Sequence, residues 1–426
     1  MATALHRGLA PLRTVLGNGA TVIAEQTATH PAVTLHVSVE AGSGHDPDDR
    51  LGLAHFVARV IDRGTISRSA DELAEAFDDR GVSLSVAVAR HLMTFTCTCL
   101  AEDVGDVLML VADVIRQPSF PTSQVEKRRS AIVTSLRQDE DNPAVVATEA
   151  LMAALYREGH PYGRRGKGTL ASVHAATRDD LAHFHAAHFS PSGLRVVIVG
   201  DVARDAATAM AAHAFGDWTA PPTSPLAPPL PPMPNGRHIQ RIDMPGKVQS
   251  DIAYGFTSIA RGDARYFPLV LMNTVLGQYG LGGRLGDNIR ERQGMAYYVF
   301  SGFDANVAPG PLLVRAGVNP ANVERTLDAI DEELNRMAAG GVMPAELDDS
   351  KRYLVGSMPR TLETNGGIAA FLHNAEFYGL GLDYDERLPS LIEAVTLDQA
   401  HDVAREFLRP DRASIVVAGP PAGAGA

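Results

Sequence analysis

The sequence has 426 residues, of which 45% are hydrophobic and 21% are charged, a composition typical of a globular protein with more than one domain. No apolar run is long enough to cross a membrane. The formal net charge of −12 argues against binding to nucleic acid, whose phosphates require a basic surface.

The N-terminal stretch lacks the apolar segment of a secretory leader. This favours a cytoplasmic location, or a periplasmic one if Met1 replaces a removed signal peptide. Alternating apolar residues then predict strands over 20–26 and 32–42, followed by a helix within 51–65. A strand pair over 82–100 precedes helices near 103–116 and over 122–141. Because strands and helices do not alternate strictly, we expect antiparallel or mixed sheets covered by helices.

Two groups of potential metal ligands have simpler interpretations. Cys97 and Cys99 lie two apart in an alternating strand pattern, which indicates small core residues on one face of a sheet. The stretch "HFHAAH" contains His183, His185 and His188, of which the last two could share a helical face. We interpret these histidines as exposed polar positions of an amphipathic helix.

The chain repeats one pattern on either side of a proline-rich segment. Residues 217–236 contain eight prolines and predict an extended linker between an N-terminal domain, 1–216, and a C-terminal domain, 237–426. In both halves a helix, a proline turn and a β-branched strand ending in glycine follow one another. Their landmarks are offset by 219 residues: Thr177, Pro191 and Gly200 correspond to Thr396, Pro410 and Gly419. We infer two duplicated α+β domains.

The helix within 51–65 has the outline of a metal-binding helix. One stripe is apolar and predicts the buried face: Leu53, Phe56, Val57, Val60 and Ile61. The other stripe carries His55, Ala58, Arg59 and Asp62. A zinc helix of the H-x-x-E-H type has histidine, glutamate and histidine at the positions of 55, 58 and 59, which here are histidine, alanine and arginine.

The stretch "AGSGHDPDDRLGLAHFVARVIDRGT" resembles the strand, loop and helix of the insulinase/pitrilysin-like metallopeptidases, in particular the processing-peptidase-like subfamily. Further stretches fit the family in order, namely "EKRRSAIVTSLRQDEDNP", "HPYGRRGKGT", "FSPSGLRVVIVGDV" and "GGRLGDNIRERQGMAYYV", so the resemblance covers essentially the whole chain. It implies an α+β fold of two homologous domains, each a mainly antiparallel sheet flanked by helices, that together form half of a clam-shell.

The resemblance also implies that the zinc ligands are lost. Active members have a third ligand, a glutamate, on a later helix, where this chain has Ser135; Arg128 stands at the place of a supporting glutamate. His55 alone cannot hold zinc, which needs about three protein ligands. Ala58 cannot act as general base, and Arg59 would repel a dication. We therefore expect this chain to bind no metal or other cofactor.

A second part of the family's chemistry is retained. An arginine and a tyrosine seven residues later face the zinc in the family and bind the scissile carbonyl, and the matching residues are Arg290 and Tyr297. A guanidinium and a phenol are suitable donors to a developing oxyanion. The spacing alone favours a surface arginine at a charged helix end and a tyrosine partly buried in the following strand, and only the whole motif favours the functional interpretation.

The resemblance therefore predicts the non-catalytic subunit of a heterodimeric zinc peptidase. Its partner would be a homologous subunit with an intact zinc motif and a bound zinc ion, and its substrates unfolded peptides. The isolated chain could form a homodimer. The alternatives are a catalytically inactive scaffold or peptide-binding protein and, less in keeping with the residues, a zinc peptidase with improvised ligands.

Overall fold

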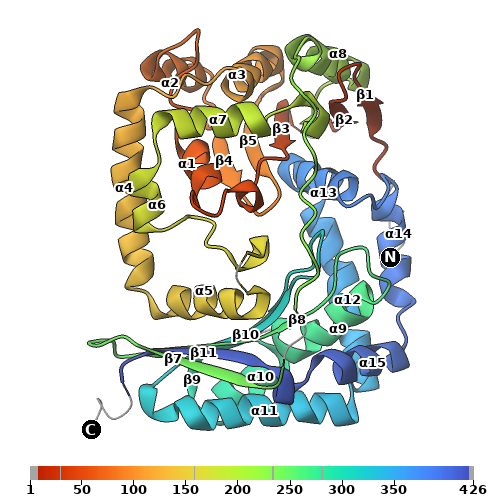
Figure 1. The fold of residues 1–426 in the computed structure, drawn as a ribbon. Helices are drawn as coiled ribbons and strands as arrows, with labels where there is room; N and C mark the ends of the chain where they lie inside the picture. Colours follow the sequence, from red (N-terminus) through yellow and green to blue (C-terminus); the bar gives the residue numbers. More distant parts are fainter. Residues whose placement is uncertain (1–7, 29, 158, 233–234, 280–281, 422–426) are drawn as a thin grey trace. The chain divides into compact units, whose positions relative to one another are not determined.

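The computed structural model describes residues 8–28, 30–157, 159–232, 235–279 and 282–421 (Figure 1). The chain divides into two compact units. Unit 1 combines 1–136, 165–226 and 357–387, and unit 2 combines 137–164, 227–356 and 388–426. In the described ranges, no helix has both the length and the apolar character needed to cross a membrane.

Unit 1 is built on a six-stranded sheet in the order β1-β2-β6-β3-β5-β4. Neighbouring strands are antiparallel except for the parallel pair β2 and β6. The strands are β1 (Leu12–Val15), β2 (Thr21–Gln26), β3 (Ala32–Val39), β4 (Ser85–Val88), β5 (Met93–Leu100) and β6 (Arg195–Gly200). The predicted mixed, mainly antiparallel sheet is confirmed.

Unit 2 repeats this sheet without a counterpart of β1. Its order is β7-β11-β8-β10-β9, and β7 and β11 again form the parallel pair. The strands are β7 (His238–Asp243), β8 (Ser250–Thr257), β9 (Ala296–Phe303), β10 (Pro311–Val318) and β11 (Ser414–Gly419). Strand β11 follows β6 by the predicted 219 residues, from 195 to 414 and from 200 to 419.

The helices of the first half are α1 (Leu53–Val60), α2 (Ala70–Asp78), α3 (Val104–Arg116), α4 (Thr122–Glu140), α5 (Pro143–Tyr156), α6 (Leu170–Ala175), α7 (Arg178–His188) and α8 (Arg204–Phe215). Those of the second half are α9 (Tyr266–Asn273), α10 (Gly283–Leu285), α11 (Val323–Gly340), α12 (Pro344–Thr361), α13 (Asn365–Phe377), α14 (Tyr384–Glu393) and α15 (Leu397–Phe407). Two π-helical segments, η5 (Thr274–Gln278) and η6 (Gly286–Arg292), adjoin α9 and α10.

The duplication extends to local hydrogen bonds. Thr177 caps α7 and Thr396 caps α15, each through a reciprocal capping box with the residue three positions later. A short 3₁₀ turn that starts at Pro191 or Pro410 then leads into β6 or β11. The same sequence pattern thus forms the same helix, turn and strand twice.

Each unit contains one helix from the other half of the chain. Helix α13 packs against β3 and β6 of unit 1, and α5 packs against β8 and β11 of unit 2. Gly255 on β8 makes room for α5, because a Cβ there would lie 2.9 Å from Leu151 Cδ2. The units therefore differ from the halves expected from the sequence, 1–216 and 237–426, by this exchange.

The proline-rich segment forms no helix or strand over 218–232, as its composition predicts; Met233 and Pro234, also part of the expected linker 217–236, lie outside the described residues. The unit boundary falls within it, between Leu226 and Ala227. In unit 2 it is held by His160, whose Nε2 lies 3.0 Å from the Pro229 carbonyl oxygen.

Candidate functional site

The first group of candidate residues lies on α1. The carboxylate of Asp46 accepts hydrogen bonds from the amides of Gly52 and Ala54, at 2.7 and 2.8 Å, and so caps the start of the helix. Gly52 has φ +90°, and a Cβ there would lie 2.6 Å from the Lys167 carbonyl oxygen. The loop that carries Lys167 therefore packs directly against the start of α1.

The apolar stripe of α1 is buried as predicted: Leu53, Phe56, Val57, Val60 and Ile61. On the other stripe His55 is partly buried, Ala58 is buried and Arg59 is exposed. Ser135, the fourth position of the degenerate motif, lies on α4 and accepts a 3.5 Å hydrogen bond from Lys167 Nζ.

These residues do not fit a zinc ion. Of the four motif positions, only His55 offers an ordinary zinc ligand, whereas tetrahedral zinc requires about three protein ligands. Among the residues that the structure describes, no group of three or more histidine, cysteine, aspartate or glutamate side chains could hold a metal ion.

Positive charge surrounds the same stripe. Arg63, one turn after Arg59, pairs with Asp62 at 3.1 Å, and Arg128 on α4 is close enough for the charges of Arg59, Asp62 and Arg63 to act on it. Burial raises the pKa of Asp62 although the three arginines oppose this. Burial and the charges of Arg63 and Arg59 lower the pKa of Arg128 against the opposing effect of Asp62. The sequence interpretation had named Arg59 and Arg128 but not Arg63, which the i, i+4 spacing from Arg59 indicates.

The other potential ligands have structural environments. Cys97 and Cys99 are buried on β5, where burial raises their pKa values to about 12 and about 11, so both remain thiols. His183 is exposed, as predicted. The prediction of exposed positions was wrong for His185 and His188. His185 is partly buried, with Nε2 2.8 Å from the Ile115 carbonyl oxygen, and the partly buried His188 ring lies 4.7 Å from that of His45.

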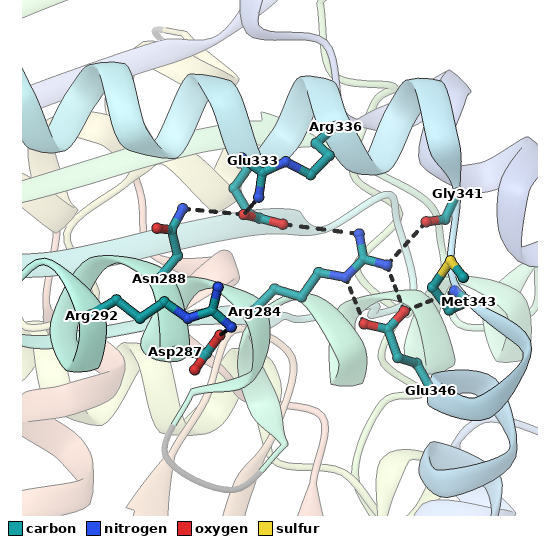
Figure 2. A network of polar contacts seen from close by, with 9 residues as sticks. All are labelled: Arg284, Asp287, Asn288, Arg292, Glu333, Arg336, Gly341, Met343 and Glu346. Carbon is teal, nitrogen blue, oxygen red and sulfur yellow. Dashed lines mark hydrogen bonds and ion pairs between the residues drawn. The ribbon is translucent and has the colours of Figure 1, made fainter.

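The second group of candidate residues lies in unit 2, on a segment that Arg284 anchors (Figure 2). Arg284 donates from Nε and Nη2 to the two carboxylate oxygens of Glu346, at 2.8 and 2.5 Å, and from Nη2 to the Gly341 carbonyl oxygen at 3.1 Å. These hydrogen bonds raise the pKa of Arg284 against the effect of burial. These two parallel N–H···O bonds hold the segment in one orientation and pair the charges of Arg284 and Glu346.

Glu333 on α11 extends this network. Its carboxylate is 98% buried and accepts hydrogen bonds from Asn288 Nδ2 at 3.3 Å and Arg336 Nη1 at 2.7 Å, while Arg284 Nη1 lies 3.9 Å away (Figure 2). Asn288 belongs to η6, so the π-helical segment is tied to α11 just before Arg290.

Arg290 lies in η6 and points to solvent. Its side chain is 41% exposed, and its ion pair is with the adjacent Glu291 at 3.5 Å. A π-helical turn is rare and shifts the side chains after it relative to an α-helix; such turns occur frequently at functional sites. The amides of Gly294 and Met295 bond back to η6, at the carbonyl oxygens of Arg290 and Ile289, and lead the chain into β9.

Tyr297 occupies a β-bulge on β9, the edge strand of its sheet. Tyr298 pairs with Gly317 and Ala296 with Val318, so Tyr297 has no partner across the ladder. It is 63% exposed, and its hydroxyl forms no hydrogen bond with the residues that the structure describes. Bulges beside active sites re-aim a side chain in this way. The hydroxyl of Tyr298, in contrast, donates to Asp251, and burial followed by this contact raises the pKa of Tyr298.

Comparison with known proteins assigns the family. Residues 21–165 match the family described as "Insulinase (Peptidase family M16)", and residues 175–354 match its "Peptidase M16 inactive domain". The chain belongs to the insulinase family of peptidases. The recognition made from its sequence motifs is confirmed, as are the family's two α+β domains.

The relatives include members named as peptidases and members named as non-peptidases. An uncharacterized zinc protease of Mycobacterium tuberculosis is 29% identical over 94% of this chain and 91% of its own length. A non-peptidase homolog of Helicobacter pylori is 25% identical over 89% of this chain and 87% of its own. A solved peptidase M16 inactive domain from Pseudomonas fluorescens is 27% identical, has a TM-score of 0.89 and covers 96% of this chain and 98% of its own.

This insulinase-family chain matches the family's inactive domain over 175–354 and lacks three of the four residues of the zinc motif, at Ala58, Arg59 and Ser135. Its candidate residues form two sets in different units: a helix without the zinc ligands in unit 1, and an exposed arginine and tyrosine in unit 2. The motif alone identified both sets. The π-helical turn, the bulge and the Arg284 network had no recognisable sequence signal.

Proposed function

We propose that this chain is the non-catalytic subunit of a heterodimeric zinc metallopeptidase that degrades or processes peptides. It pairs with a homologous subunit that has an intact H-x-x-E-H motif, and Arg290 and Tyr297 act at the partner's zinc site. The observation that carries this proposal is the exposure of both side chains in a chain whose own helix lacks the zinc ligands.

The chemistry of the two side chains suits this role. In the partner, zinc polarises the scissile carbonyl and activates water. Arg290 donates charged N–H groups and Tyr297 an O–H group toward the oxygen on which negative charge develops. The Tyr297 hydroxyl is not used within the described part of the chain, so it is available to a bound peptide. A residue with a purely structural role would more commonly have an internal partner, as Tyr298 has in Asp251.

The anchoring of the segment supports the same proposal. The Arg284 network fixes α10 and η6 against α11 and α12 (Figure 2). The turn at 293–295 fixes the start of β9. Electrostatic stabilisation of a developing charge requires donors that are already in place, because reorientation during the reaction would cost free energy. Arg290 and Tyr297 are thus exposed side chains on a well-anchored backbone.

The test is to purify this chain, a homologue with the intact motif and their mixture, and to assay cleavage of unfolded peptides. We expect activity only in the mixture. Arg290→Ala and Tyr297→Phe should each lower kcat in the mixture by about 10²-fold, because each removes one donor to the developing oxyanion.

Two substitutions serve as matched controls. Arg292→Ala removes a 72% exposed arginine from the same segment, and Tyr353→Phe removes the hydroxyl of another exposed tyrosine in unit 2. Both should leave kcat unchanged. Activity of the mixture that does not depend on Arg290 and Tyr297 would contradict the proposal and favour a scaffold or peptide-binding protein. Stoichiometric zinc and cleavage by this chain alone would favour an independent peptidase.

A further inference from the structure

The stripe of α1 that would face zinc in an active member carries a surplus of positive charge. We define the arginine cluster as Arg59, Arg63 and Arg128. Asp62 is the acidic side chain whose charge acts on all three arginines, and its ion pair is with Arg63, at 3.1 Å. Three guanidinium groups therefore share one carboxylate, and the surplus charge is positive where the family's dication would sit.

The cluster also has unused hydrogen-bond donors. Arg128 and Arg59 form no hydrogen bond or ion pair within the described ranges. The Nε atoms of Arg63 and Arg128 are buried from solvent without an acceptor. An arginine presents five N–H donors in a planar fork, and a buried donor without a partner costs about 1–3 kcal/mol. Such donors are satisfied when an anion with several oxygens binds.

The residue that follows Arg128 on α4 is held in place by several contacts. The guanidinium carbon of Arg129 lies 5.2 Å from the Phe56 ring centroid on α1, its Nη1 donates to the Val173 carbonyl oxygen, and its Nε and Nη2 each donate to Glu126 at 3.0 Å. Arg128 itself lies where the charges of Arg59 and Arg63 act on it. Ala58 has only a methyl group and so offers these arginines no carboxylate.

We propose that the arginine cluster binds a carboxylate of a peptide, either an acidic side chain or the C-terminal group. That the ligand is a peptide rests on the proposed function; that it is anionic rests on the cluster. A guanidinium pairs with a carboxylate through two parallel N–H···O bonds, a geometry that ammonium groups cannot provide. A single carboxylate needs only a local cluster of positive charge. A nucleic acid needs an extended basic face, and a net charge of −12 argues against one.

Binding can be measured on the isolated full chain by titration calorimetry with three unlabelled decapeptides. The first alternates glutamate and glycine and ends in an amide; the second replaces glutamate by glutamine; the third is the glutamine peptide with a free C-terminal carboxylate. We expect the first or the third to bind at least about tenfold more tightly than the second, and the difference to shrink as salt is added. Which peptide gains identifies the source of the carboxylate.

Substitutions locate the binding site. Arg128→Gln and Arg59→Gln should each remove about tenfold of the affinity for the preferred peptide. Arg59 is exposed, so its replacement does not disturb the core even if that of Arg128 does. Lys127→Gln, an exposed cation adjacent to Arg128, is the matched control and should leave the affinity unchanged.

Equal affinity for the three peptides, no binding, or acidic-peptide binding that survives both arginine substitutions would overturn the inference. None of these results affects the mixture assay of the proposed function, which depends on Arg290 and Tyr297. Conversely, arginine-dependent binding in a chain that activates no partner would uphold the carboxylate site and reject the subunit role.

Discussion

His373 lies on α13, where it packs against β3 and β6 of unit 1. It is 3% exposed, its Nε2 is 2.7 Å from Ser38 Oγ, and its ring lies 4.6 Å from that of His36. Burial, followed by the charges of His36 and Arg195, lowers the pKa of His373 to about 3. Burial also lowers the pKa of His36.

These pKa values predict a loss of stability in acid. In the unfolded chain a histidine titrates near pH 6.5, so below that pH the unfolded state binds protons that the folded state does not. Stability is therefore fully present above about pH 6.5 and falls toward pH 3, with each such histidine contributing a slope of up to about 1.4 kcal/mol per pH unit.

Urea unfolding at pH 7.5 and pH 5 would measure this loss. His373→Gln should reduce the difference in unfolding free energy between the two pH values, whereas His183→Gln, at an exposed position, should not. An undiminished difference in the His373 variant would show that other groups cause the acid sensitivity.

At the scale of elements, Arg284 determines where η6 lies. Arg284→Gln removes the bidentate contact with Glu346 and leaves the buried Glu333 with Arg336 as its remaining ion pair in the described ranges. We therefore expect the unfolding free energy to fall by about 2–4 kcal/mol. Arg292→Gln, which breaks only an exposed pair with Asp287, should cost less than about 1 kcal/mol.

Denaturant unfolding gives both values, and the same variants report on the site. If η6 positions Arg290, the Arg284 variant lowers kcat in the mixture although it keeps both donor side chains. A stable Arg284 variant with full kcat would show that the network is not required to position Arg290.

For the whole molecule, the exchange of α5 and α13 makes the two halves of the chain interdependent. A fragment of 1–216 lacks α13, whose Asn365 donates to the Ala32 carbonyl oxygen at 3.0 Å and whose Leu372 is buried. A fragment of 237–426 lacks α5, including the buried Leu151 and Tyr156. Each fragment would leave apolar surface of its sheet exposed to water, which is strongly unfavourable.

We therefore expect neither fragment to unfold cooperatively by itself, and the two together to regain native-like thermal unfolding monitored by circular dichroism. The intact chain is the reference for the unfolding temperature. A fragment of 1–216 that unfolds alone with the temperature and steepness of the intact chain would show that α13 contributes little to unit 1.

The sequence by itself determined the duplicated α+β fold, several strands and helices of the first half together with the repeated helix and strand, and it nominated both sets of candidate residues. These depend on local periodicity, on capping patterns such as those of Thr177 and Thr396, and on motifs of fixed spacing. Only the tertiary structure decided the exchange of α5 and α13, the bulge at Tyr297 and the approach of Arg128 to Arg59 and Arg63. The physical reason is that an amphipathic helix fits any apolar sheet face of suitable shape, and a charge on one helix acquires its neighbours only when another helix packs beside it.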